Sequence, residues 1–182
     1  MPRFCSACGA PIGVRAPVTC AECGTAHWHN AKPAGAALVV HEGSLLLTRR
    51  AIDPWRGMWC APSGFCDTDE HPAVCAERET LEEAGVRVRV IGYLGHWIDE
   101  YLPPADEPSE AQYCAVSYYH AVPVGEPQPL LRDDDEVQEV AWFAADELPS
   151  DLAPPVNGPR IYAAWRKALA AGRLETVLPD CA

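Results

Sequence analysis

Hydrophobic and polar positions follow two different spacings along the chain. Short apolar or alternating stretches predict β-strands, and longer stretches with apolar residues every three or four positions predict helices. The predicted strands are residues 34–40, 44–48, 86–94, 113–122 and 137–143. The first two flank Gly43 and are expected to form a hairpin.

Two predicted helices are bounded by residues that suit helix ends. Pro72 fits the first position of one helix, and Gly85 fits the residue just past its end. The second helix is expected over residues 159–171, before Gly172. Strands and helices that alternate in this way predict an α/β fold with a mixed sheet between helices.

The helix between Pro72 and Gly85 carries a cluster of acidic side chains. Because successive helical residues turn by about 100°, Glu79, Glu82 and Glu83 are expected on the side opposite its small residues. Like charges at this spacing destabilise a helix by a few tenths of a kcal/mol per pair. A hard divalent cation removes that repulsion and prefers oxygen ligands. The pattern therefore predicts a cation site, and a solvated acidic helix face is the alternative.

The N-terminal segment contains two Cys-x-x-Cys pairs, each followed by glycine. The cysteines are Cys5, Cys8, Cys20 and Cys23. Four thiolates suit a tetrahedral Zn²⁺ ion, and so short a segment needs metal to supply its folding energy. We therefore predict a structural zinc ribbon over residues 1–30. A redox pair is the alternative, but it does not explain two pairs. We expect His27 and His29 to be loop or interface residues rather than ligands.

Composition limits the expected partners and compartment. The chain has 182 residues, 48% of them hydrophobic, and a net charge of −12. This charge argues against a nucleic-acid partner and against a polybasic membrane anchor. The apolar run at residues 34–40 is too short to cross a bilayer. Nine cysteines without an evident signal peptide predict a reducing, cytoplasmic location.

Residues 64–86 combine the acidic helix with the segment before it into one motif. The spacing is G-x5-E-x7-R-E-x-x-E-E-x-G, followed by an aliphatic residue. Its fixed positions are Gly64, Glu70, Arg78, Glu79, Glu82, Glu83 and Gly85. This resembles the Nudix box, the signature of Mg²⁺-dependent hydrolases of nucleoside diphosphates linked to another group. Thr80 departs from the pattern, which usually has an aliphatic residue there, and it is expected to face the core.

The resemblance implies a fold, a cofactor and roles for the box residues. It implies a Nudix α/β/α sandwich over residues 34–175, with Mg²⁺ or Mn²⁺ as the cofactor, and it is compatible with a homodimer. By the resemblance, Glu79 and Glu83 are the principal metal ligands, Glu82 is a further ligand, and the Gly64 carbonyl is an additional one. It also implies an ion pair between Arg78 and Glu70.

An acidic loop outside the box offers a general base. Some members of the family take a base or a metal ligand from an acid a few residues before a strand that carries tryptophan. Glu136, which precedes the Trp142 strand, is the residue in that position. A solvated acidic turn is the alternative.

The resemblance leaves several substrates open, all of them small-molecule nucleotides. We expect ADP-ribose or a related dinucleotide. A ribbon before a Nudix domain is similar to the layout of NADH pyrophosphatases, so NADH or NAD is an alternative. Their Ser-Gln-Pro-Trp-type motif is not matched, because residues 95–100 read GHWIDE. A non-catalytic metabolite sensor is a further alternative.

Candidate substrate-binding residues lie on both sides of the box. Arg49 and Arg50 are candidates for phosphate contacts, although exposed arginines at strand ends are common. Aromatic side chains are candidates for base stacking, although each is more often a core or loop anchor. They are Trp55, Trp59, Trp97, Tyr101 and Tyr118.

Overall fold

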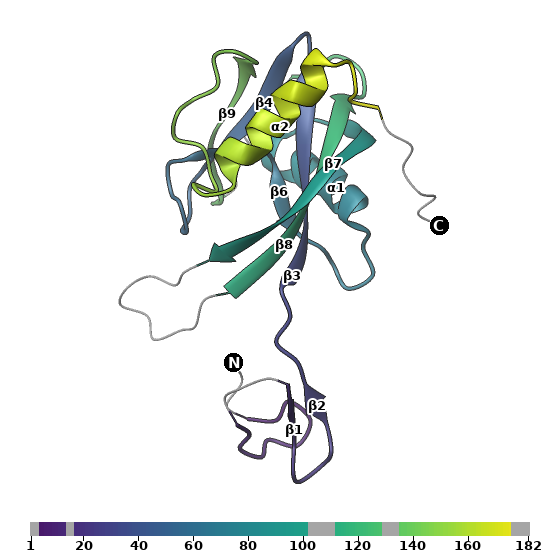
Figure 1. Cartoon of the computed structure of the whole chain (residues 1–182), viewed down its shortest axis with the longest axis vertical. Coiled ribbons are helices and arrows are strands. Elements are labelled where there is room, and N and C mark those ends of the chain that lie inside the picture. Colours follow the sequence, from purple (N-terminus) through teal and green to yellow (C-terminus); the bar gives the residue numbers. More distant parts are fainter. Residues whose placement is uncertain (1–3, 14–16, 102–111, 129–134, 176–182) are drawn as a thin grey trace.

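The computed structural model, shown in Figure 1, describes residues 4–13, 17–101, 112–128 and 135–175. A small N-terminal module precedes a larger body of strands and helices. In the module, β1 (Val18–Thr19) pairs antiparallel with β2 (Ala26–His27). Within the described ranges, no helix has the length and apolar character needed to cross a membrane.

A mixed sheet forms the centre of the body. Its strands are β3 (Lys32–His41), β4 (Ser44–Arg50), β5 (Trp59–Cys60), β6 (Ser63–Phe65), β7 (Val88–Tyr101), β8 (Gln112–Pro123) and β9 (Val137–Ala144). The central strand β3 runs parallel to β8 and antiparallel to β4 and β6. Strand β7 extends the sheet beyond β8, while β5 and β9 both pair with β4. The predicted mixed sheet is confirmed.

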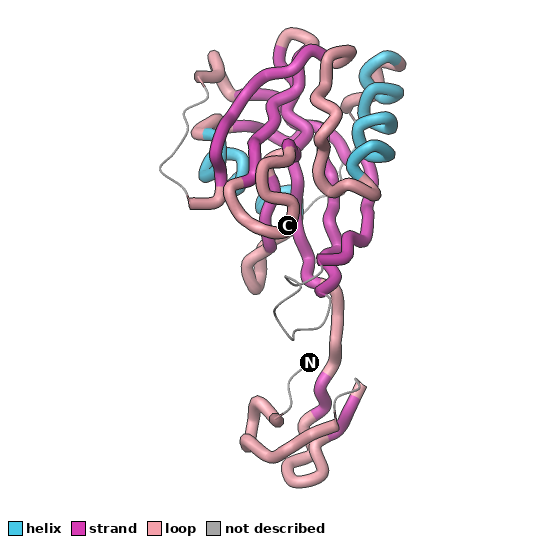
Figure 2. Tube along the Cα trace, turned by 90° about the vertical axis from the view of Figure 1, so that its left-hand side faces the viewer, coloured by secondary structure: helices cyan, strands magenta, loops and turns pink. Residues whose placement is uncertain are grey.

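One helix covers each face of this sheet. The helices are α1 (Pro72–Ala84) and α2 (Gly158–Ala170). Along β3, Leu38 packs in the cluster that contains Trp165 of α2, whereas Val39 packs in the cluster that contains Ala76 of α1. Alternate residues of a strand point to opposite faces, so the strands lie between two cores and two helices (Figure 2). The α/β/α sandwich is confirmed.

Helix α1 packs very closely on β3. A Cβ atom added at Gly35 would collide with the backbone carbonyl oxygen of Pro72. Only glycine permits so close an approach of helix and strand. Gly35 therefore fixes the first turn of α1 against the sheet, next to the segment that carries the acidic residues.

The structure extends the sheet beyond the predicted strands. Strand β7 was expected to end at residue 94, but it continues to Tyr101 because it pairs with β8 along its whole length. The pairing register shifts between Val90 and Gly92 and between Tyr93 and Gly95, so Ile91 and Leu94 are the extra residues in β7. Strands β5 and β6 were not predicted. Helix α2 begins and ends one residue earlier than expected.

Candidate active site and cysteine cluster

Local sequence chemistry sets the bounds of α1. Pro72 occupies the first turn, and the His71 ring accepts a hydrogen bond from the Ala73 amide (3.1 Å). Gly85 ends the helix with φ 69°, in the left-handed region that glycine adopts without strain. Both predicted ends are confirmed, and Thr80 faces the core as expected, with no exposed surface.

The three glutamates of α1 do not share one solvent-facing side. Glu82 is exposed and Glu79 is half-buried, but Glu83 is only 8% exposed. The expectation that all three stand on the side opposite the core is therefore wrong for Glu83. The reason is tertiary packing, because Glu83 points to β4 and accepts a hydrogen bond from the Thr48 hydroxyl (3.1 Å). Burial, and secondarily the charge of Glu79, raise the pKa of Glu83 to about 8.

Arg78 connects the helix to the loop before it. Its Nε and Nη2 donate to both carboxylate oxygens of Glu70 (2.9 and 2.7 Å), and its Nη1 donates to Glu79 and Glu82 (2.8 and 2.9 Å). Nη2 also donates to the Phe65 carbonyl (3.1 Å). The implied Arg78–Glu70 ion pair is present. The Arg78 guanidinium beside Glu70 lowers the pKa of that carboxyl to about 2.

Gly64 lies directly beneath the Glu79 carboxylate. A Cβ atom at Gly64 would collide with the carboxylate atoms of Glu79. The Gly64 carbonyl also accepts a hydrogen bond from the Cys75 thiol (3.3 Å). A side chain at this position would displace Glu79, so the glycine allows the carboxylate and the β6 backbone to lie together.

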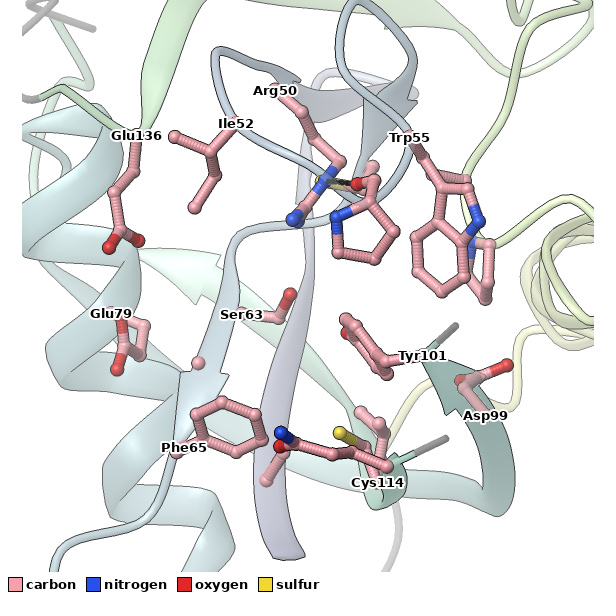
Figure 3. Close-up of a pocket in the computed structure, with 18 of the residues that line it drawn as sticks. Arg50, Ile52, Trp55, Ser63, Phe65, Glu79, Asp99, Tyr101, Cys114 and Glu136 are labelled. Atoms are coloured by element: carbon pink, nitrogen blue, oxygen red, sulfur yellow. Dashed lines mark hydrogen bonds between the residues drawn. The ribbon is translucent and has the colours of Figure 1, made fainter. Parts of the chain in front are cut away.

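A cavity of about 870 Å³ opens beside these residues. Glu79 and Glu136 lie at one end of it in Figure 3, and Trp55, Tyr101 and Asp99 lie at the other end. Arg50 projects between the two ends, and its Nε donates to the Pro54 carbonyl (2.8 Å). The cavity therefore has an acidic end suited to cations and an aromatic end suited to a flat ring.

Only some of the candidate substrate-binding residues reach this cavity. Arg50, Trp55, Tyr101 and Tyr118 line it. The other candidates, Arg49, Trp59 and Trp97, are not among its lining residues.

Each of those three side chains has another structural role. Arg49 donates to the Gly57 carbonyl and pairs with Glu139 (3.6 Å). Trp59 packs edge-on against Phe143, and Trp97 packs edge-on against Tyr118. They stabilise a loop, the core and the sheet rather than forming the cavity wall.

Phe65 and Asp99 are among the cavity residues that were not singled out from the sequence. Phe65 follows Gly64 within the box, where the pattern leaves the residue type free. Asp99 belongs to the stretch that failed to match the Ser-Gln-Pro-Trp-type motif, and it lies beyond the predicted end of β7. The sequence contained one signal for Asp99, because it is a charged residue in the segment where a substrate-binding motif was expected.

Glu136 faces the box from a different part of the chain. Its backbone carbonyl accepts a hydrogen bond from the Ala51 amide (2.7 Å), which holds the segment before β9 against the loop after β4. Its side chain lines the cavity, and its charge is among the influences that raise the pKa of Glu79, after burial. Glu136 and Glu79 therefore lie at the same end of the cavity. The neighbouring Asp133 and Asp134 are outside the described residues.

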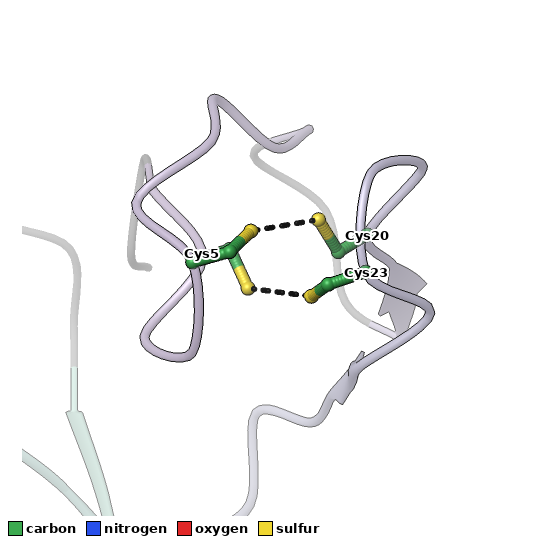
Figure 4. A group of neighbouring side chains, drawn as sticks. Cys5, Cys20 and Cys23 are labelled. Carbon is green, nitrogen blue, oxygen red and sulfur yellow. Dashed lines mark hydrogen bonds between the residues drawn. The ribbon is translucent and has the colours of Figure 1, made fainter.

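The four cysteines of the N-terminal module converge (Figure 4). Their sulfur atoms all lie within 4.8 Å of one another, with Cys5–Cys23 at 3.6 Å and Cys8–Cys20 at 3.7 Å. Tetrahedral ligands at the usual Zn–S bond length are about 3.8 Å apart, so the cluster fits a zinc ion. No other group of described residues gathers potential metal ligands so tightly.

Contacts around the cluster lower the pKa of the Cys5 and Cys23 thiols, whereas hydrogen bonds with the other cysteines raise the pKa of the Cys8 thiol. The His27 ring lies 3.2 Å from the Cys5 sulfur, as a neighbour of the cluster. Burial opposes ionisation of Cys5, but the backbone amides of Ala7 and Cys8 and then His27 outweigh it and lower its pKa to about 6. A hydrogen bond with the Thr25 hydroxyl lowers the pKa of Cys23. Thiolates are the form in which cysteine binds metal.

Comparisons with known proteins match this arrangement. A family model described as NUDIX domain matches residues 31–164. The NAD-capped RNA hydrolase NudC of Stutzerimonas stutzeri (strain A1501) is 29% identical over 181 residues, which cover 97% of this chain and 60% of the relative. The NudC protein of Chromobacterium violaceum is 29% identical over 158 residues, covering 85% of this chain and 54% of the relative. The chain thus spans little more than half the length of these curated relatives.

Solved structures share the fold. A NUDIX hydrolase from Nitrosomonas europaea has a TM-score of 0.75 at 28% identity, over 97% of each chain. An ADP-ribose pyrophosphatase from Streptococcus suis has a TM-score of 0.57 at 20% identity, over 77% of this chain and 92% of that one. The second likeness concerns the fold alone.

Proposed function

Because the chain belongs to the Nudix hydrolase family, we propose that it hydrolyses the diphosphate bond of a nucleoside diphosphate linked to another moiety. We propose ADP-ribose or a related dinucleotide as the substrate. The supporting observation is a single cavity that has the Glu79 carboxylate at one end and the Trp55–Tyr101 pair at the other. A dinucleotide needs this combination, because its phosphates require a cation and its base a flat apolar surface.

The donor set at the acidic end suits Mg²⁺ or Mn²⁺. Glu79 and Gly64 line the cavity, whereas Glu82 and Glu83 are not among its lining residues. Glu83 would contribute a carboxylate one turn after Glu79 on α1, with the exposed Glu82 beside it. When bound, such a cation lowers the pKa of a water molecule, aligns the phosphates and neutralises the leaving phosphate. Arg78 and Thr48 orient Glu79 and Glu83 through hydrogen bonds.

Glu136 is the proposed general base. It lines the cavity and lies at the same end as Glu79. From there its carboxylate would accept the proton of the attacking water. Arg50, between the two ends, would neutralise charge on the substrate phosphates.

The N-terminal module is proposed to hold Zn²⁺ as a structural ion. Four converging thiols form a closed tetrahedral donor set, which leaves no position for a substrate. The ion would supply folding energy to a segment that lacks a core of its own. The boundaries of the two domains, a cytoplasmic location and a homodimer stay predictions.

NAD(H) and NAD-capped RNA are the second candidate substrates. The observation in their favour is the name of relatives such as the Stutzerimonas protein, whose similarity covers 97% of this chain, ribbon included. The absence of the Ser-Gln-Pro-Trp-type motif argues against them. A non-catalytic sensor is the third possibility, and the intact box glutamates argue against it.

A substrate panel distinguishes these three proposals. Purified protein is incubated with ADP-ribose, NADH, NAD and a 5′-NAD-capped oligonucleotide, with Mg²⁺, Mn²⁺ or EDTA, and products are identified by mass. AMP and ribose 5-phosphate, formed only with metal, support the proposal. Preferential release of nicotinamide mononucleotide from the NAD substrates would favour the second candidate. Binding without turnover of any substrate would favour the sensor.

A further inference from the structure

The aromatic end of the cavity contains a buried carboxyl group. Asp99, on β7, is only 4% exposed and lines the cavity beside Tyr101. Figure 3 places it on the side away from Glu79 and Glu136. No basic side chain of the described residues forms an ion pair with it. A buried carboxylate without a cation is costly unless hydrogen-bond donors satisfy it.

Among the described residues, one side-chain donor holds Asp99 in place. The Nδ2 of Asn157 donates to Asp99 Oδ1 (2.8 Å) and to the Ile98 carbonyl (3.0 Å). Asn157 occupies the N-cap position of α2, but its side chain makes no capping hydrogen bond there. Its amide bonds β7 instead. No donor in the part of the chain that the structure describes bonds Asp99 Oδ2, so this oxygen can accept a hydrogen bond from a ligand in the cavity.

The neighbouring side chains suit a flat ring. The rings of Trp55 and Tyr101 lie 4.8 Å apart and both line the cavity. Trp55 has φ 69°, in the left-handed region that bulky residues rarely adopt. Such strain persists where surrounding contacts hold it, often at ligand sites. The Arg50 guanidinium, 5.9 Å from the Trp55 ring, is one of those contacts.

We propose that Asp99 is the residue that selects the base, by accepting a hydrogen bond from the exocyclic amino group of adenine. This inference rests on the proposed function and names the part of the substrate that the aromatic end holds. A phosphate would be repelled by a carboxylate, so the diphosphate belongs at the acidic end with its cation. Adenine is flat and presents an amino donor at its edge. Burial raises the pKa of Asp99, and the hydrogen bond from the neutral Asn157 amide opposes that shift without cancelling it.

The orientation of Asn157 predicts what a substitution will do. In Asp99→Asn, the oxygen of the new amide takes the hydrogen bond from Asn157 Nδ2, so its own NH₂ group faces the cavity. The cavity then offers a donor instead of an acceptor. Hypoxanthine carries an acceptor oxygen where adenine carries its amino group, so the substitution should shift preference from adenine to hypoxanthine.

The test compares ADP-ribose with inosine diphosphate ribose, which differ only in the base. We expect the wild type to prefer ADP-ribose in kcat/KM, and Asp99→Asn to reduce that preference by about 10- to 100-fold or reverse it. Both substrates are measured on the same preparation of each variant, so a misfolded fraction lowers both kcat/KM values equally and leaves their ratio unchanged. The control is Glu100→Gln, an exposed neighbour that bonds the Tyr113 hydroxyl (3.0 Å) and should retain the wild-type ratio.

Each outcome has a distinct meaning. An unchanged base preference in Asp99→Asn, with both substrates still hydrolysed, would overturn the role of Asp99 and leave the proposed function intact. If the wild type hydrolyses neither substrate, the proposed function fails. The inference is then tested by calorimetric binding of the two nucleotides to wild type and Asp99→Asn, where the same change in ratio is expected.

Discussion

The cysteine cluster and the glutamate site of α1 both gather ionisable ligands, but they are organised differently. The four sulfurs converge within 4.8 Å, and each Cys-x-x-Cys turn is closed by its own backbone hydrogen bonds, such as Gly9 N to Cys5 O (2.9 Å). The glutamates diverge instead. Glu83 is buried against Thr48, while Glu82 is exposed beside Arg78.

This difference agrees with the kind of ion that we propose for each site. A structural ion is best enclosed by protein ligands that occupy every coordination position. A catalytic cation must keep positions for water and phosphate, so its protein ligands are few and lie at the edge of a cavity. Arg78 forms ion pairs with Glu70, Glu79 and Glu82, whereas hydrogen-bond contacts such as that between the His27 ring and the Cys5 sulfur surround the converging thiols.

Removing one thiol should have the largest effect. Structural zinc sites contribute roughly 10–16 kcal/mol of binding free energy to folding, so Cys8→Ser should lose most of its zinc and unfold the N-terminal module. Zinc content and protease sensitivity of residues 1–30 measure this. Hydrolysis by the remaining body should stay close to the wild-type rate, because the cavity contains no residue of the module.

A matched control is Cys66→Ser, since Cys66 is outside the cluster and should leave zinc content unchanged. Equal zinc in Cys8→Ser and wild type would show that the site does not use four thiolates. A loss of hydrolysis as large as the loss of zinc would mean that the two sites are not independent.

Removing one carboxylate from α1 should affect chemistry and spare the fold. Glu83→Gln should lower hydrolysis by at least about 100-fold at saturating Mg²⁺, because an amide binds hard cations poorly. The melting temperature should stay close to that of the wild type, since a neutral amide of nearly the same shape replaces the buried carboxyl and the Thr48 hydroxyl can still donate to the amide oxygen. Rates and thermal unfolding are measured on the same preparation. Glu139→Gln, on the exposed surface, is the control, and full activity of Glu83→Gln would disprove the ligand assignment.

Local chemistry made much of the fold predictable. Pro72 and Gly85 specified the ends of α1 because capping depends on neighbouring residues. The strand pattern located the central strands for a similar reason, since alternate burial follows from the geometry of a single strand. The convergence of the cysteines was also predictable, because their spacing encodes two turns that a shared ion brings together.

Features that depend on distant segments were not predictable. The burial of Glu83 depends on Thr48, which lies in another strand of the sheet. Arg50 lines the cavity and Arg49 does not. This depends on the pairing of β4 with β9, whose register shifts between these two residues. The position of Asp99 depends on how far β7 pairs with β8. In each case tertiary pairing decides which side chain faces the cavity.

The smallest effect concerns the ion pair that organises the glutamate site. Bidentate bonds from Arg78 lower the pKa of Glu70 to about 2 from an ordinary value of 4.5. A carboxyl whose pKa is lowered by folding stabilises the protein above the unfolded pKa, and that stability is lost as pH falls from about 4.5 towards 2. Glu70→Gln should therefore be less stable than the wild type by about 1–2 kcal/mol at pH 7, and the difference should shrink below pH 4.5.

Urea unfolding of both proteins across this pH range measures that difference. Glu139→Gln is again the control, because its 3.6 Å pair with Arg49 is exposed and should contribute close to nothing. If the free energies of unfolding of Glu70→Gln and wild type differ by the same amount at every pH, the ion pair does not stabilise the charged form of the Glu70 carboxyl. That result would mean that Arg78 does not position the glutamates. The contrast with the cysteines, which the backbone hydrogen bonds of their own turns position, would then no longer hold.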